Sequence, residues 1–423
     1  MKQTSPVKVL HVSTLDTQGG AARATYRLHS ALKANNVDSK LLVQNKSSDD
    51  PYVITETGIT KKIINRLRPT LDSIPVKFYK NRGESLFSPA YLPFSNIAKK
   101  INGINPDIVH LHWVCHGMIK IEDLNKIKAP IVWTLHDNWA FTGGCHIMWE
   151  CKKYQDACGC CPRLGSDSEK DLSRRVFNRK SRAFPKVKHL TVVGVSSWLA
   201  ECAKRSPLFK NRNIVNLPNP LNTNKFKPFD KNKARELWNL PKDKKLILFG
   251  ANSATADLNK GFKELCSALR KLKSDDIELV IFGSSEPEQS QNLGFAANYL
   301  GHVFDDVSLL TIYSAADVMI VPSLQEAFGQ TASESMACGT PVVAFGHTGL
   351  LDIIDHKENG YLATPIDSDD LAKGIDWVLN VEADIYEKLC LSARNKVINE
   401  FDNEVVAKKY IKLYEKVINE THQ

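Results

Sequence analysis

The sequence predicts an α/β protein with two doubly wound domains, each a parallel sheet covered by helices on both faces. Three observations predict this fold. Short continuous apolar runs rich in β-branched residues recur along the chain, amphipathic stretches separate them, and a proline-rich break divides them into two sets. Such runs are typical of strands that are buried on both faces. The chain of 423 residues is also too long for one compact core and suits two domains.

The predicted strands are residues 7–12, 108–111, 131–135 and 190–195 in the first domain, and 246–249, 279–282, 318–321 and 342–345 in the second. The break between the two sets is Leu217-Pro218-Asn219-Pro220 followed by a polar, Lys-rich stretch. We therefore expect a first domain at 1–217 with a Cys-rich insertion at 145–161, a linker at 218–235, a second domain at 236–400 and a C-terminal helix at 401–423. This last helix is able to cross back and brace the first domain. Ligands of such sheets bind beyond the carboxyl ends of the strands, so we expect two Rossmann-like domains facing across a cleft.

The composition is that of an ordinary globular protein, with 43% hydrophobic and 24% charged residues. No apolar run approaches the roughly 18 residues that a membrane-spanning helix needs. The first residues lack the long apolar core and the small-residue cleavage site of a secretory signal. We therefore expect a cytoplasmic protein.

The charge is distributed unevenly. Residues 1–220 hold 34 Lys and Arg against 17 Asp and Glu, a net charge of +17, whereas residues 221–423 hold 22 against 30, a net charge of −8. The basic first half indicates an anionic partner, and nucleic acid, an anionic membrane or a phosphate-bearing substrate all have the required sign. No nucleic-acid recognition motif accompanies it, so we expect no nucleic-acid partner.

Basic residues concentrate at 61–82 and at 174–188. The first segment also carries apolar residues at roughly helical spacing, which is typical of a surface segment resting on anionic lipid. We expect Pro69 and Pro75 to interrupt this helix. The alternative is a solvated helix with an ordinary buried face.

Two glycine-containing turns are candidates for anion binding. Gly19 and Gly20 lie between the first strand and a helical stretch at 24–34. Glycines there let the backbone approach a ligand, and a helix N-terminus favours negative charge. A plain tight turn explains this pair equally well. In the second half, a helix begins near Gly329 and follows the strand at 318–321.

Two carboxylates accompany this second turn, Glu326 in the loop and Glu334 in the helix. Carboxylates beside an anion site suit a ligand rich in hydroxyl groups. The alternative is a pair of solvated charges at the end of a helix.

These two residues form E-x7-E inside Pro322-Ser323…Glu326-Ala327-Phe328-Gly329…Glu334-Ser335-Met336-Ala337-Cys338-Gly339-Thr340-Pro341. This stretch resembles the signature of retaining glycosyltransferases of the GT-B fold, in the large family-4 group. Further matching segments are Leu217-Pro218-Asn219-Pro220 with Phe226, Lys260-Gly261, Gly301-His302-Val303, Gly19-Gly20, and Leu135-His136-Asp137. The resemblance covers nearly the whole chain and is more specific in the second half.

The resemblance implies roles for particular residues. Glu326 is expected to bind hydroxyls of the donor sugar, Glu334 the ribose, and Lys260 the leaving diphosphate. Backbone N–H groups of the two turns assist, and His136 orients the sugar near the reacting carbon. The donor-binding set is Gly19, Gly20, Asn252, Gly301, His302, Val303, Phe328, Gly329, Gln330 and Glu334. Asn252 stands where many relatives carry an Arg, and Arg23 is a candidate substitute for it.

Such sites need no catalytic metal. Asp367-Ser368-Asp369 has the D-x-D pattern of metal-binding sites. It precedes a helical stretch, however, and is more simply explained as a helix N-cap.

The function that the resemblance implies is retaining transfer of a sugar from a nucleotide-diphosphate donor to a hydroxyl of a saccharide. Trp133-Thr134-Leu135-His136-Asp137-Asn138-Trp139, followed by cysteines, resembles transferases that build bacterial capsule, O-antigen or exopolysaccharide. The expected acceptor is linked to a lipid diphosphate at the inner face of the cytoplasmic membrane, which the basic half contacts peripherally. Two alternatives stay open: a nucleotide-sugar epimerase of the same fold, and a nucleotide-sugar binding protein without turnover.

The Cys-rich insertion carries the spacing C-x5-C-x6-C-x2-C at Cys145, Cys151, Cys158 and Cys161. Four thiolates at such spacing predict a tetrahedral structural zinc, with His146 or Cys160 as a substitute ligand. Reduced, metal-free cysteines are the alternative. We further expect His110 and His112 to point to opposite faces of their strand, with His112 free to touch the acceptor.

Overall fold

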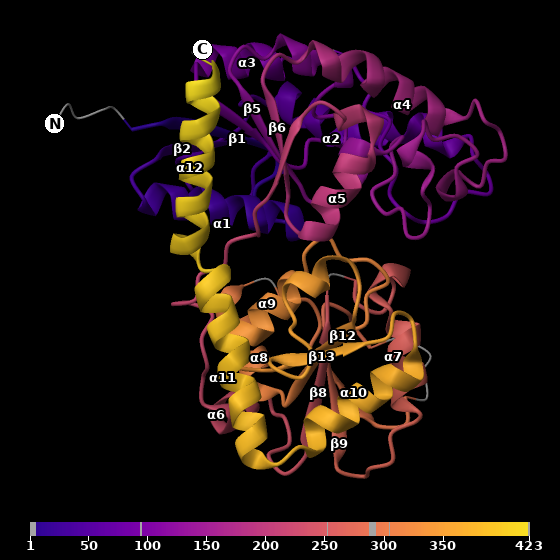
Figure 1. Ribbon diagram of the computed structural model, residues 1–423, viewed down its shortest axis with the longest axis vertical. Helices are drawn as coiled ribbons and strands as arrows, with labels where there is room; N and C mark the ends of the chain where they lie inside the picture. Colours follow the sequence, from indigo (N-terminus) through magenta and orange to yellow (C-terminus); the bar gives the residue numbers. More distant parts are fainter. Residues whose placement is uncertain (1–5, 94, 252, 287–292, 304, 422–423) are drawn as a thin grey trace. The chain divides into compact units, whose positions relative to one another are not determined.

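The computed structural model describes residues 6–93, 95–251, 253–286, 293–303 and 305–421. The chain divides into two compact units, Met1–Pro218 with Val406–Gln423, and Asn219–Val405. Each unit is a parallel sheet flanked by helices, in line with the predicted fold class (Figure 1).

The sheet of the first unit has the order β3-β2-β1-β4-β5-β6-β7. Its strands are β1 (Lys8–Leu15), β2 (Asp38–Asn45), β3 (Val53–Ile54), β4 (Ile108–Leu111), β5 (Ile131–Leu135), β6 (Leu190–Gly194) and β7 (Asn213–Asn216). Its helices are α1 (Gly20–Ala34), α2 (Ile59–Lys77), α3 (Ile97–Ile104), α4 (Leu172–Ala183), α5 (Ser197–Arg205) and most of α12 (Asn403–Thr421). The chain order reverses between β1 and β4, which is where ligands of doubly wound sheets bind.

The C-terminal helix α12 completes the core of the first unit (Figure 1). Its apolar residues recur at helical spacing and pack with Val9 of β1, Leu28 of α1 and Ile108 of β4. Tyr410 and Tyr414 carry hydroxyls into this core, where both find polar partners on the sheet. The helix therefore belongs structurally to a sheet that lies about 300 residues earlier in the chain.

Helix α2 runs unbroken through Pro69 and Pro75, so the expected interruption was wrong. A proline in a helix leaves the carbonyl four residues earlier without its N–H partner. Here the two orphaned carbonyls accept from side chains instead: Asn65 O from Gln44 Nε2 at 3.4 Å, and Leu71 O from Tyr91 Oη at 2.9 Å. These substitute bonds allow one helix of 19 residues.

The sheet of the second unit has the order β10-β9-β8-β11-β12-β13. Its strands are β8 (Lys245–Gly250), β9 (Ile277–Phe282), β10 (Ala296–Tyr299), β11 (Val318–Val321), β12 (Val342–Phe345) and β13 (Gly360–Ala363). Its helices are α6 (Lys231–Leu237), α7 (Phe262–Leu269), α8 (Asp306–Ala315), α9 (Gln330–Ala337), α10 (Ser368–Asn380) and α11 (Ala383–Glu400). Here the order reverses between β8 and β11.

Most of the segment predicted as a linker, 218–235, is packed into the second unit. Phe226 is fully buried, and Thr223 Oγ1 donates to Asp402 at 2.6 Å. Arg235, on α6, is buried and donates to the Asp317 carboxylate at 2.8 Å. The second unit therefore begins at Asn219, because these side chains need its core and its carboxylates.

Candidate active site

The candidate site of the second unit lies at the carboxyl ends of β8 and β11. Lys260 ends the short 3-10 helix η7 (Leu258–Lys260), and Gly261 follows with a φ of 71°. A Cβ at Gly261 would lie 1.8 Å from the carbonyl oxygen of Pro322, so only glycine lets the two loops approach this closely. The loops are also joined by Asn259, whose side chain donates to Gln325 O at 2.8 Å.

Lys260 and Glu326 form the polar centre of this region. Lys260 Nζ lies 2.6 Å from Glu326 Oε1, which also accepts from Ser323 Oγ at 3.0 Å. Thr348 Oγ1 accepts from the backbone N–H of Glu326 at 3.1 Å, which fixes the loop. Burial alone would lower the pKa of Lys260, but the Glu326 carboxylate outweighs it and raises that pKa above its ordinary value. Lys260 is therefore a cation at neutral pH.

Gly329, with a φ of 106°, is the N-cap of helix α9, and as a glycine it has no side chain to cap this end. A helix N-terminus of this kind presents N–H groups and favours an anion. The side chain of Phe328 is buried and packs edge-on against Phe401. The donor-binding role that we expected of the backbone N–H groups of Phe328, Gly329 and Gln330 stays a prediction.

Glu334 is not a solvated charge at the end of a helix. Its side chain is buried, and Oε2 accepts from Tyr313 Oη of α8 at 2.8 Å. Tyr313 therefore orients this buried carboxylate, whose oxygens are acceptors of the kind that a ligand hydroxyl needs. Gly301, of the expected base-binding loop 301–303, follows β10 and accepts from the N–H of Gly283 at 2.7 Å. Asn252 lies outside the described residues.

In the first unit, Gly19 is the N-cap of α1, with a φ of 89°, and a Cβ there would meet no atom of the described chain within 4 Å. Asp16, just before this turn, accepts from the backbone N–H groups of Ser47 and Ser48 at 2.9 and 2.7 Å. Burial would raise the pKa of Asp16, but these bonds and that from the Ser47 hydroxyl lower it overall. The charged carboxylate thereby ties the glycine turn to the segment after β2.

His136 follows β5 and ends a chain of three hydrogen-bonded imidazoles. His11 Nδ1 lies 2.9 Å from His112 Nε2, and His112 Nδ1 lies 3.0 Å from His136 Nε2. Burial lowers the pKa of all three rings, that of His136 to about 4, so all three imidazoles are neutral at pH 7. Each contact then requires one N–H donor and one bare nitrogen.

The direction of the hydrogen bonds between these imidazoles follows from the surroundings of His11. His11 Nε2 is buried, with no hydrogen-bond partner among the described residues. A buried N–H without an acceptor is rarer and more costly than a bare buried nitrogen, so the proton of His11 belongs on Nδ1. His11 then donates to His112, and His112 donates to His136 Nε2. The proton of neutral His136 therefore lies on Nδ1.

The expectation that His110 and His112 point to opposite faces was wrong. Side chains two residues apart on a strand share a face, and the two rings lie 4.1 Å apart. His110 Nδ1 lies 2.7 Å from Tyr414 Oη, and its Nε2 lies 2.7 Å from Thr134 Oγ1. Among the described residues, His11, His110 and His112 form the only group of potential metal ligands found within 4.8 Å of one another. Five of their six ring nitrogens have hydrogen-bond partners, so we interpret the group as a hydrogen-bonded cluster.

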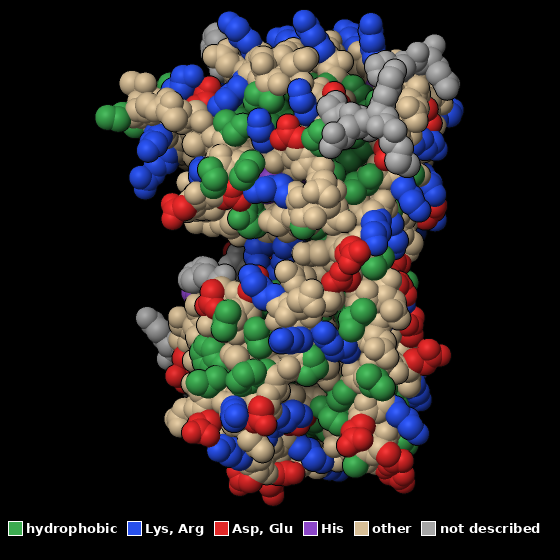
Figure 2. All heavy atoms as spheres, turned by 90° about the vertical axis from the view of Figure 1, so that its left-hand side faces the viewer, with side chains coloured by type: hydrophobic (Ala, Val, Ile, Leu, Met, Phe, Trp, Pro, Cys, Tyr) green, Lys and Arg blue, Asp and Glu red, His purple; other side chains and the backbone are tan. Residues whose placement is uncertain are grey.

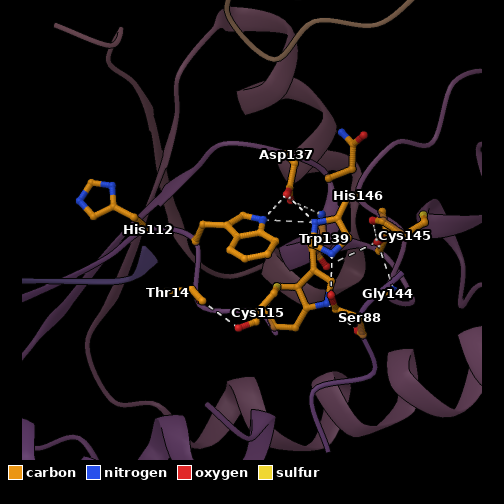
Figure 3. A network of polar contacts seen from close by, with 12 residues as sticks. Thr14, Ser88, His112, Cys115, Asp137, Trp139, Gly144, Cys145 and His146 are labelled. Carbon is orange, nitrogen blue, oxygen red and sulfur yellow. Dashed lines mark hydrogen bonds and ion pairs between the residues drawn. The ribbon is translucent and has the colours of Figure 1, made fainter. Parts of the chain in front are cut away.

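Asp137 anchors the segment that follows His136 (Figure 3). Its carboxylate lies 2.6 Å from His146 Nδ1 and accepts from Trp113 Nε1 at 2.8 Å and from the backbone N–H of Trp139 at 2.8 Å. Burial would raise the pKa of Asp137, but His146 and the other donors lower it overall. Trp139 itself is buried and donates to the Ser88 carbonyl at 2.8 Å, so it is unsuited to stack on a sugar.

The four cysteines of the predicted zinc site line one small cavity of about 20 Å³. Their sulfurs are not among the ligand groups found within 4.8 Å of one another in the described residues. In a tetrahedral site with Zn–S bonds of about 2.3 Å, sulfurs lie about 3.8 Å apart. Both nitrogens of His146 are engaged, by Asp137 and by Ser88 Oγ at 2.8 Å, which argues against His146 as a substitute ligand. The zinc site itself stays a prediction.

The residues that sequence reasoning missed are partners of the predicted ones. Thr348 holds Glu326, and His11 holds His112. The sequence did name Ser323 and His112, but not their contacts to Glu326 and His136. The signal for Ser323 was its place three residues before Glu326, in the loop that follows β11. The signal for His11 and His112 was a histidine on each of two neighbouring strands.

Two units of this architecture, each with a glycine turn at its switch point, define a GT-B glycosyltransferase fold. Residues 18–225 match the family model of Glycosyltransferase Family 4, and residues 230–396 match that of Glycosyl transferases group 1. The chain belongs to the family-4 glycosyltransferases of the GT-B fold.

The chain is similar to several curated proteins. It is 28% identical over 346 residues to an uncharacterized glycosyltransferase, MJ1607, of Methanocaldococcus jannaschii, which covers 75% of this chain and 85% of that protein. It is 29% identical over 255 residues to an N,N'-diacetylbacillosaminyl-diphospho-undecaprenol alpha-1,3-N-acetylgalactosaminyltransferase of Campylobacter jejuni, which covers 59% and 66%. It is 25% identical over 353 residues to a phosphatidyl-myo-inositol mannosyltransferase of Mycobacterium leprae, which covers 82% of each.

Solved structures share the fold. A sucrose-phosphate synthase from Thermosynechococcus elongatus superposes with a TM-score of 0.69 at 21% identity and covers 98% of this chain and 99% of that one. HepE of Anabaena in complex with UDP-glucose superposes with a TM-score of 0.63 at 15% identity and covers 97% and 99%. No helix in the described part of the chain is both long and apolar enough to span a bilayer.

Proposed function

We propose that this glycosyltransferase moves a sugar, with retention of configuration, from a nucleoside-diphosphate sugar to a hydroxyl of a lipid-diphosphate-linked saccharide. The observation that carries the proposal is the Lys260–Glu326 pair beside the Gly261 turn, in a chain of this family. The names of two relatives support a lipid-linked acceptor, and that of HepE with UDP-glucose supports the donor class. The product belongs to bacterial surface polysaccharide, such as O-antigen, capsule or exopolysaccharide.

In the proposed reaction, the bond between the anomeric carbon and the diphosphate oxygen breaks, and a bond from that carbon to the acceptor oxygen forms. The departing phosphate takes the acceptor proton, so no protein base is needed. Lys260 and the N-terminus of α9 stabilise the negative charge that develops on the diphosphate, which is the largest contribution such a site makes. Glu326 accepts hydrogen bonds from the hydroxyls of the donor sugar, and Glu334 binds the ribose.

His136 is proposed to orient the donor sugar. With its Nε2 engaged by His112, the Nδ1–H is the group that is left to donate to the sugar. The imidazole chain fixes both the ring plane and the tautomer, so His112 and His11 act as positioning residues. We propose transfer without a catalytic metal at the cytoplasmic side of the membrane. None of the ten cysteines forms a disulfide in the structure, and such a set of cysteines is typical of proteins in a reducing compartment.

The test is incubation with a panel of UDP- and GDP-sugars and a saccharide linked to undecaprenyl diphosphate, with and without EDTA. We expect one donor to give transfer that EDTA does not abolish, and nuclear magnetic resonance of the product to show the anomeric configuration of the donor. A new sugar epimer without acceptor would instead identify an epimerase. Nucleotide-sugar binding without either product would identify a binding protein.

A further inference from the structure

Helix α2 has the reverse of the usual amphipathic arrangement. The residues that it buries are Asn65, Arg68, Asp72 and Val76, three of them polar. An ordinary surface helix buries an apolar stripe and exposes polar residues. Here the exposed stripe is apolar, with residues spaced three or four apart: Ile59, Ile63, Leu67, Leu71, Ile74 and Phe78, which are 39–79% exposed.

The polar inner face is fully engaged by the first unit. Arg68 Nε donates to the Gly117 carbonyl at 2.6 Å, and the Asp72 carboxylate accepts from the N–H groups of Ala90 and Tyr91 at 3.3 and 3.2 Å. Asn65 Nδ2 donates to Gln44 O at 3.0 Å. These bonds fix the rotation of the helix, so the apolar stripe cannot turn inward without breaking them.

The exposed stripe is unusual for this chain. Seven of the seventeen exposed large apolar side chains in the described residues lie on α2 or its C-cap, with Ile64 as the seventh. At 100° per residue, the six residues of the stripe fall within an arc of about 120°. A contiguous patch of this size marks an interaction surface.

The positive charge beside the apolar stripe favours an anionic partner. On the same helical projection, Lys62, Arg66 and Lys77 border the stripe, and all three side chains are exposed. Lys80 and Arg82 follow beyond the C-cap and are exposed too. The one acidic residue of the helix, Asp72, is buried. In Figure 2, Lys and Arg side chains likewise gather over the first unit, at the top of the view.

The second basic segment is less suited to this role. Arg179 of α4 donates to both oxygens of Glu122 at 2.7 Å, and Lys180 is fully buried. Lys180 donates to the carbonyls of Trp139 and Thr142. The charges at the centre of α4 therefore stabilise the first unit rather than face a partner.

We propose that α2 docks the protein on an anionic phospholipid surface, with the apolar stripe among the acyl chains and the basic border on the lipid phosphates. A bilayer interface offers apolar and anionic groups together along the roughly 28 Å length of such a helix. The inference rests on the proposed function in one respect, because a lipid-linked acceptor is reached at a bilayer.

The experiment is co-sedimentation of the full chain with vesicles that contain no acceptor, made of phosphatidylglycerol and phosphatidylethanolamine in equal parts or of phosphatidylcholine alone. We expect binding to the anionic vesicles that weakens with added salt. The double variant Ile63→Ser with Leu67→Ser should lower the partition coefficient at least about tenfold, because two apolar anchors are lost. Lys62→Gln with Arg66→Gln should lower it by a similar factor on anionic vesicles only.

The matched controls are Leu237→Ser with Leu391→Ser, two apolar residues exposed on the second unit, and Lys233→Gln with Lys263→Gln. These should bind vesicles like the parent protein. Equal binding by all variants would overturn the proposal. So would a lack of vesicle binding together with a concentration-dependent dimer that the Ile63/Leu67 variant abolishes, since that result assigns the stripe to a second copy. Transfer to a detergent-solubilised acceptor is measured in parallel, so that a failure of docking and a failure of the proposed function are distinguishable.

Discussion

The ammonium of Lys260 and the carboxylate of Glu326 are 66 residues apart in the chain and 2.6 Å apart in space. They meet because β8 and β11 are neighbours in the sheet and Gly261 lets their two loops touch. The pair places a fixed cation beside a hydroxyl acceptor at the switch point of a doubly wound sheet, where ligands of this fold bind.

Removing either charge should reduce catalysis more than stability. We expect Glu326→Gln and Lys260→Met each to lower kcat by about 10²–10³-fold, because each removes a preorganised contact to the reacting donor. The measurement is initial-rate kinetics with the donor and acceptor that the panel of nucleotide sugars identifies. Lys263→Met, one residue beyond the start of α7 and exposed, is the control. Parent-like kcat in both site variants would remove these residues from the reaction.

Gly261 should be the least replaceable glycine of the site. Alanine there combines an unfavourable φ of 71° with a Cβ 1.8 Å from the Pro322 carbonyl oxygen, so the backbone must move. Gly294 has a similar φ of 79°, and no atom of the described residues lies within 4 Å of its Cβ position. We expect Gly294→Ala to lower the free energy of unfolding by about 1 kcal/mol and Gly261→Ala by at least about 3 kcal/mol. Urea unfolding of both variants checks this, and equal losses would contradict the steric argument.

Several elements were predictable from the sequence because their signal is local. The apolar runs at 108–111, 131–135, 318–321 and 342–345 are strands with the same bounds in the structure. These strands are buried on both faces, so every residue in them except His110 and Thr134 is apolar. The strands β2, β3, β7, β10 and β13 were not predicted. In β7 and β10 the residues are partly exposed and mixed in character, which hides the signal of a buried strand.

The candidate site was predictable only as single residues. Motifs within one stretch of sequence pointed to Lys260, Glu326 and His136, but not to the partners that hold them. Thr348 reaches Glu326 from the loop after β12, and His11 reaches His112 from β1. Such pairs depend on strand order and register, which one sequence does not specify. The reversed face of α2 likewise required the structure, because helical spacing alone does not say which stripe is buried.

The cysteine cluster gives a prediction about metal content. We expect the purified protein to carry about one zinc per chain by atomic absorption, and a strong chelator to lower its melting temperature. Cys158→Ser with Cys161→Ser should lose the metal, whereas Cys390→Ser, a free cysteine of the second unit, should retain it. Zinc binding requires the four cysteine sulfurs around the cavity to lie closer together than they do in this structure. A metal-free parent protein with an unchanged melting temperature in chelator would show that the cysteines are simply reduced thiols.

The buried imidazoles should make stability fall as the pH is lowered below 6.5. Burial lowers the pKa of His11, His110 and His112 well below 6.5 and that of His136 to about 4. Between pH 6.5 and 4 the unfolded chain therefore binds protons that the folded chain excludes. The free energy of unfolding then decreases with falling pH by up to about 1.4 kcal/mol per pH unit for each such histidine. Urea unfolding at pH 7, 6 and 5 should show a shallower dependence of the unfolding free energy on pH for His11→Asn than for the parent protein, because one buried imidazole is removed. Identical slopes for the parent and His11→Asn would mean that His11 takes up its proton over the same pH range in the folded and the unfolded protein. The neutral row of imidazoles from His11 to His136 would then have to be abandoned.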